Sequence, residues 1–172
     1  ATCRLMNTAA MLTLQELLDY TTAETRRWRE WLAAQPLALL ELPAGDGRTA
    51  TVRRLIHHIV VVERRYADRL CGAPVTEYET VSSETLDELF AAFEDARRML
   101  SAWVDSATDD DLRRTVQFTT LTAGTLEAST RKIVIHALLH GMRHWAQIAA
   151  VVRQHGYPTD WQHDILMSDA LH

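Results

Sequence analysis

Apolar side chains recur every three or four residues along four stretches of the chain, which is the spacing of amphipathic helices. The first stretch begins after Thr13, with Glu16 three residues later as in a capping box, and stops before Pro36. The second covers residues 51–71 and stops at Gly72, a residue type that commonly follows helix C-termini. Both stretches therefore combine helical periodicity with the signals that begin and end a helix.

The second half of the chain predicts two further long helices. The third begins near Ser82 and Ser83, and the fourth covers residues 129–154. Between them, residues 109–112 predict a short helical turn, and the threonine-rich residues 115–125 predict either a loop or a brief extended piece. Helices with one apolar stripe each can bury those stripes against one another. We therefore expect an all-α fold, an antiparallel four-helix bundle with long connecting loops.

The length of 172 residues suits one domain, which we expect to cover residues 11–172, with residues 1–10 as a disordered tail. Eighteen basic and 23 acidic side chains give a net charge of -5, which argues against binding to the phosphate backbone of nucleic acids. No apolar run approaches the roughly 18 residues that a membrane-spanning helix needs. The two cysteines are too few for the disulfide framework of a secreted protein, so we expect a cytoplasmic location.

Three histidines, His136, His140 and His144, stand four residues apart in the fourth predicted helix. Each step of four residues rotates the side chain by only about 40°, so all three share the apolar face of that helix. Buried imidazoles without partners are costly, and charged neighbours would repel one another. A divalent metal ion resolves this conflict, because it takes neutral imidazole nitrogens as ligands.

One helix cannot supply the whole site, because His136 and His144 are separated by roughly 12 Å along the helix axis. Two histidines four residues apart can bind one ion, so a third ligand has to come from another helix. In the second predicted helix His58 lies about 60° from the apolar Leu55, whereas His57 lies about 160° away and is expected to face solvent. We therefore expect His58 to be the third ligand and His136 to support the site or pack beside it.

Three further residues near these histidines allow two interpretations each. Gln147 shares the histidine face and is either a partner that fixes an imidazole tautomer or an ordinary buried amide. Glu63 either hydrogen-bonds a ligand or pairs on the surface with Arg64 or Arg65. Gly141 either allows a neighbouring helix to approach closely or leaves room for a substrate.

The two histidine strings resemble those of the DinB-like (DinB/YfiT) family of metal-dependent four-helix-bundle proteins. The strings are His58-Ile-Val-Val-Val-Glu and His136-Ala-Leu-Leu-His140-Gly-Met-Arg-His144-Trp-Ala-Gln147, and the resemblance extends from about residue 12 to 166. By position it implies a metal site made by His58, His140 and His144, the same residues that the helix geometry favours. Many members have arginine directly after the last ligand, where this chain has Trp145.

Three neutral imidazoles leave a divalent ion its full charge and at least one free coordination position, as in catalytic rather than structural sites. We expect zinc or nickel. The resemblance implies a metal-dependent enzyme acting on a small molecule, either a transferase or isomerase that uses a low-molecular-weight thiol or a hydrolase. The alternative is a non-catalytic, stress-related protein that binds a metal or another ligand. We expect neither nucleic acid nor membrane as a partner, and, from the resemblance and the apolar first and third helices, a homodimer.

Overall fold

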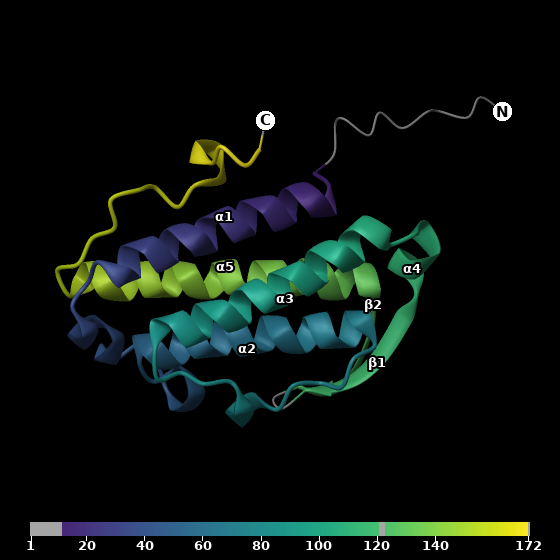
Figure 1. Cartoon of the computed structure of the whole chain (residues 1–172), viewed down its shortest axis with the longest axis horizontal. Helices are drawn as coiled ribbons and strands as arrows, with labels where there is room; N and C mark the ends of the chain where they lie inside the picture. Colours follow the sequence, from purple (N-terminus) through teal and green to yellow (C-terminus); the bar gives the residue numbers. More distant parts are fainter. Residues whose placement is uncertain (1–11, 121–122, 172) are drawn as a thin grey trace.

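The computed structural model describes residues 12–120 and 123–171, and most of this span is helical (Figure 1). The long helices are α1 (Leu14–Ala33), α2 (Val52–Cys71), α3 (Leu86–Ser106) and α5 (Thr130–Gln154). The shorter elements are η2 (Leu37–Glu41), η3 (Gly47–Thr49), η4 (Tyr78–Thr80), α4 (Asp109–Arg113), β1 (Thr115–Thr120), β2 (Gly124–Ser129) and η5 (Ile165–Met167). The predicted disordered tail, residues 1–10, lies outside the described residues.

The helix ends confirm the capping signals in α1 and correct the one predicted for α3. Thr13 and Glu16 form the expected capping box at the start of α1. In α3 the capping residue is Thr85, whose side chain accepts from the backbone of Glu88 while the Glu88 carboxylate accepts from the backbone of Thr85. Helix α3 therefore starts later than predicted, because Ser82 has no acidic residue three positions on with which to form a reciprocal box.

Helices α2 and α3 run parallel, which corrects the prediction that neighbouring helices are antiparallel. Arg53, near the start of α2, donates to the carbonyl oxygen of Ser83 just before α3, and Glu63, farther along α2, pairs with Arg97 of α3. Residues 72–85 return along the whole of α2 before α3 begins, so the two helices share a direction (Figure 1). Helices α1 and α5 are also parallel, whereas α2 and α5 run in opposite directions.

A two-stranded hairpin forms in the threonine-rich stretch, which the sequence allowed to be either a loop or a brief extended piece, and the fold is otherwise helical as predicted. Strands β1 and β2 pair in antiparallel register from Thr115 opposite Ser129 to Thr120 opposite Gly124. Alternate residues of β1 are half-buried, and Phe118 packs edge-on against Tyr66 of α2 with the ring centroids 6.0 Å apart. The β-branched residues favour this extended conformation, and one half-buried face holds the hairpin on the helices.

The apolar faces of the four long helices meet in two clusters of buried residues, one toward each end of the bundle. Their largest fully buried side chains include Trp28 of α1, Phe90 and Phe93 of α3, and Trp145 of α5. The indole rings of Trp28 and Trp145 are stacked with their centroids 5.1 Å apart. This packing fixes α5 rotationally, so that the histidine face of α5 is directed toward α2. No helix of the described residues is long and apolar enough to span a membrane.

Candidate metal centre

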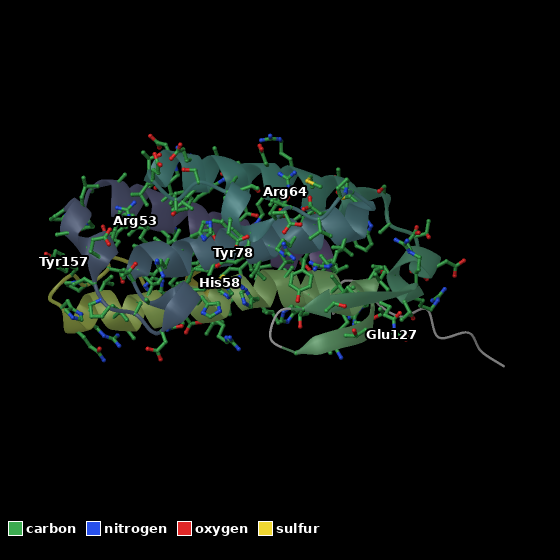
Figure 2. The ribbon with its side chains drawn as sticks, turned by 90° about the horizontal axis from the view of Figure 1, so that it is seen from below. Arg53, His58, Arg64, Tyr78, Glu127 and Tyr157 are labelled. Carbon is green, nitrogen blue, oxygen red and sulfur yellow. The ribbon has the colours of Figure 1, made fainter. Side chains whose placement is uncertain are left out.

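The antiparallel pair α2 and α5 brings the three predicted ligands together. His58 lies in the second turn of α2, and His140 and His144 lie one turn apart in α5. One nitrogen from each ring belongs to a group whose members all lie within 4.8 Å of one another. Figure 2 shows His58 and Tyr78 beside each other on the face where α2 and α5 meet. The structure therefore brings side chains that are 82 residues apart in the sequence into one cluster.

The two neighbouring histidines lie outside this group. His57 is turned away from the cluster, as predicted, but it does not face open solvent. Its Nε2 lies 2.9 Å from the carbonyl oxygen of Val81, so the connection from α2 to α3 covers it. His136 is exposed, with its ring centroid 5.6 Å from that of His140 and 5.2 Å from that of Tyr66. It stands beside the cluster, as expected, but it is not buried on the apolar face of α5, where the four-residue spacing had placed it.

A hydrogen-bond chain determines which nitrogen of His144 is free. The amide nitrogen of Gln147 donates to the carbonyl oxygen of Ala44 at 2.7 Å, which directs the amide oxygen of Gln147 to Nδ1 of His144 at 3.1 Å. Because that oxygen can only accept, Nδ1 of His144 carries the proton and Nε2 keeps its lone pair. The Nε2 atom is buried and has no hydrogen-bond partner among the described residues. Gln147 thus occupies the tautomer-fixing position that the sequence allowed.

Tyr78 orients the second ring, and sequence reasoning missed it. Its hydroxyl lies 3.3 Å from Nδ1 of His58. Tyr78 belongs to η4, in the long connection between α2 and α3, and is largely buried. The guanidinium of Arg48 lies over the ring of Tyr78, 4.4 Å from its centroid. No helical or strand periodicity marks this segment, so only the path of the connection along α2 reveals the contact.

The electrostatics of the cluster keep the three imidazoles neutral near pH 7. Burial lowers the pKa of His58 to about 4 and that of His140 to about 3, and the neighbouring imidazoles and Arg143 add to both shifts. Burial also lowers the pKa of His144, against the opposing effect of its hydrogen bond to Gln147. A neutral imidazole has one nitrogen lone pair free for a metal ion, and protons do not compete for it at neutral pH.

These residues fit a divalent metal ion. The donor set consists of three neutral imidazoles, which suits zinc, nickel and related ions better than calcium or magnesium. Two of the rings, His58 and His144, have their other nitrogen bonded to a neighbouring side chain, the arrangement that normally orients metal-binding histidines. The unpartnered Nε2 of His144 would otherwise be a buried polar atom without compensation.

Glu63 has neither of the roles that the sequence suggested. Its side chain is buried in the core and forms an ion pair with Arg97 of α3, with 2.7 Å between the nitrogen and oxygen. It therefore neither binds the histidines nor pairs on the surface with Arg64 or Arg65. Burial raises the pKa of the Glu63 carboxyl, and the charge of Arg97 opposes that effect. The sequence could not identify Arg97 as the partner, because it lies 34 residues away on another helix.

Gly141, between the two histidines of α5, marks a close approach of α2. A Cβ atom added there would lie 3.5 Å from Cγ2 of Ile59 and 3.9 Å from Oε2 of Glu63. Side chains of α2 therefore fill the space beside this glycine, and none is left there for a substrate.

Comparison with known proteins identifies the family. No curated protein sequence matches the chain significantly. A family model does match: the model described as the DinB family aligns with residues 6–167, which include all three clustered histidines and both helices that carry them. With nearly the whole chain covered by this match, the chain belongs to the DinB family.

Proposed function

We propose that this protein is a metal-dependent enzyme in which His58, His140 and His144 bind one divalent ion, zinc or nickel. Its substrate is a small molecule, and its reaction is a transfer or isomerisation that uses a low-molecular-weight thiol, or a hydrolysis. The observation that carries the proposal is the buried, unpartnered Nε2 of His144, held unprotonated by Gln147 beside two neutral imidazoles.

A bound divalent ion would act as a Lewis acid that lowers the pKa of a water molecule or thiol at its free position. The protein's own residues prepare that position. Gln147 keeps the proton on Nδ1 of His144, and Tyr78 orients the ring of His58. The rings of His58 and His140 are only partly buried, which leaves an approach from solvent and supports a catalytic site rather than a storage site.

The proposal extends to the assembly and the surroundings of the protein. The four long helices form the bundle that the family resemblance implies, with two parallel and two antiparallel neighbouring pairs. The protein acts as a cytoplasmic homodimer, and its partners are small molecules rather than nucleic acid or membrane. The net charge of -5 supports the absence of a nucleic-acid partner. Light scattering at micromolar concentration tests the dimer, and a monomer would contradict it.

Metal analysis of protein purified without a histidine tag tests the ligand assignment. Each single substitution His58→Ala, His140→Ala and His144→Ala should reduce the bound metal to a small fraction of the wild-type content. His57→Ala and His136→Ala are matched controls from the same helices and should retain it. Equal losses in His57→Ala and His58→Ala would contradict the assignment.

Cobalt substitution tests whether the site is catalytic. Cobalt(II) bound by three imidazoles and a thiolate has a characteristic absorption, so a thiol that occupies the free position is seen directly. A bound thiol that is consumed in a transfer reaction supports the enzyme. Binding of the ion with no effect of thiols and no hydrolysis of ester substrates would instead favour a non-catalytic metal-binding protein.

A further inference from the structure

The residues that follow α5 form a C-terminal segment, residues 155–171, which runs back along α1 (Figure 1). Two of its side chains contact one buried carboxylate of α1. The indole nitrogen of Trp161 donates to the two carboxylate oxygens of Glu24 at 3.0 and 3.2 Å, and Nδ1 of His163 lies 2.6 Å from the first of them. Because Glu24 is only 5% exposed, these bonds hold Trp161 at a fixed place against α1.

An open hollow of about 560 Å³ lies where the end of α1 meets the C-terminal segment. The indole rings of Trp31 and Trp161 line it, with their centroids 6.3 Å apart and their planes at 67°, and Trp161 is the more exposed of the two. Trp28, which is fully buried, meets both rings edge to face, with centroid separations of 5.6 and 5.2 Å. The hollow therefore has a wall of two large aromatic rings that the core holds in place.

The other residues of the lining make this hollow negatively charged. It includes the carboxylates of Glu30 and Asp160, and no basic side chain of the described residues lies within ion-pair distance of either. Arg27 is the only cation among the described residues that line the hollow, so two carboxylates face one guanidinium. The C-terminal end of α1 adds partial negative charge, and the last turn of this helix contains no basic residue.

The bond between Trp161 and Glu24 makes the indole ring more attractive to a cation. The face of an aromatic ring carries the negative part of its quadrupole, and tryptophan binds cations better than the other aromatic side chains do. An N–H group that donates to a carboxylate is polarised by it, which raises the electron density of the ring. Trp161 therefore presents a ring face of increased negative potential at a negatively charged hollow.

We propose that this hollow binds a small organic cation whose charge is surrounded by methyl or other apolar groups, as in a quaternary ammonium compound. The rings of Trp31 and Trp161 contact the apolar groups, and the carboxylates of Glu30 and Asp160 balance the charge. An anion would be repelled by these carboxylates, and a metal ion would hold its water too strongly to gain from the rings. None of the lining residues belongs to the histidine cluster, so the inference does not depend on the metal centre.

Choline and 3,3-dimethyl-1-butanol test the inference, because they have nearly the same shape and only choline is charged. Binding is measured by NMR titration of the indole N–H signals, and the signal of Trp161 is identified by its loss in Trp161→Phe. The wild-type protein should bind choline at least about tenfold more tightly than the alcohol, which corresponds to about 1.4 kcal/mol, and the Trp161 signal should move.

Phosphocholine distinguishes a free cation from a lipid headgroup, in which choline always carries a phosphate. The carboxylates of Glu30 and Asp160 should repel that phosphate, so phosphocholine should bind more weakly than choline. Tighter binding of phosphocholine would contradict the assignment to a free cation.

The double variant Glu30→Gln/Asp160→Asn keeps the shape of the hollow and removes its two carboxylates. Both residues are exposed, so the fold should be unaffected. Binding of choline should weaken by about three- to tenfold, and binding of the alcohol should not change. Glu127→Gln removes an exposed carboxylate of the hairpin and is the matched control, with both dissociation constants unchanged.

Three results would overturn the inference. The first is equal binding of choline and the alcohol, or no binding of choline. The second is unchanged binding of choline in Glu30→Gln/Asp160→Asn, because the cation would then bind elsewhere. The third concerns His140→Ala, which should bind choline as the wild-type protein does. A loss of choline binding in that variant would place the cation at the histidine cluster instead.

Discussion

The buried ion pair between Glu63 and Arg97 offers the strongest test of how this core is stabilised. Substituting Arg97 with methionine removes the guanidinium and its hydrogen bonds to the Glu63 carboxylate and to the hydroxyl groups of Thr21 and Thr22. Both hydroxyl groups keep their bonds to backbone carbonyl oxygens of α1. The carboxylate of Glu63, only 1% exposed, is then left without a partner in an apolar core.

The expected cost follows from that unpaired charge. Removing one partner of a buried ion pair typically costs about 3–5 kcal/mol, whereas replacing both by apolar side chains is often neutral. In this pair, Oε1 of Glu63 and Nε of Arg97 have no hydrogen-bond partner among the described residues, so the desolvation of the two charges is incompletely compensated. Arg97→Met should therefore lower the free energy of unfolding by about 3–5 kcal/mol. The double variant Glu63→Leu/Arg97→Met should lower it by far less than the two single substitutions together.

Urea denaturation of the wild-type protein, the two single variants and the double variant completes the thermodynamic cycle. In a chain of this length, 1 kcal/mol shifts the melting temperature by about 2–4 °C, so Arg97→Met should melt about 6–20 °C lower. Asp87→Asn removes the carboxylate of the exposed Arg29–Asp87 pair and is the control, with an expected loss of stability below about 1 kcal/mol.

The pH dependence gives a second, independent readout. Burial raises the pKa of the Glu63 carboxyl, and without Arg97 nothing opposes that effect. In the folded variant the Glu63 carboxyl then binds a proton more tightly than it does in the unfolded chain. The loss in free energy of unfolding relative to wild type should therefore shrink as pH falls from 7.5 to 5. The reasoning would be refuted by a loss below about 1 kcal/mol in Arg97→Met, or by additive losses in the double variant.

Three further outcomes are expected. Gln147→Leu removes the acceptor that keeps the proton on Nδ1 of His144, so metal affinity, measured by competition with a chelator, should fall about 10- to 100-fold; unchanged affinity would exclude this role. Burial lowers the pKa of His140 to about 3 in the metal-free protein, whereas the unfolded chain protonates this ring near pH 6.5. Between these two pKa values the unfolded chain therefore binds more protons than the folded protein, so the free energy of unfolding should fall as pH falls. This ring contributes at most about 1.4 kcal/mol per pH unit, and less because it is partly exposed. When urea denaturation is compared at pH 6.5 and pH 4.5, the free energy of unfolding should fall less in His140→Asn than in wild type. Equal falls would argue against the lowered pKa of His140. Gly141→Ala places a methyl group at ordinary contact distance from Ile59 and should stabilise the helix by up to about 1 kcal/mol, seen as a higher melting temperature; a lower one would mean that α2 cannot accommodate it.

The sequence alone determined the features that depend on neighbours along the chain. The capping box at Thr13 and the glycine at Gly72 place the ends of two helices, because each acts through backbone groups within one turn. The four-residue spacing of His140 and His144 puts them on one helical face, and rotation about the helix axis separates His58 from His57. These local relations were sufficient to predict which histidines the structure brings together.

Only the tertiary structure decided the features that join distant segments. The parallel direction of α2 and α3 depends on the path of residues 72–85, which carries no periodic pattern, and that path places Tyr78 against His58. The burial of Glu63 depends on Arg97, a residue on another helix that its own sequence neighbourhood does not indicate. A polar side chain can lie in an apolar core only when such a partner compensates its desolvation, and the identity of the partner is set by how the helices pack rather than by the residues beside it in the chain.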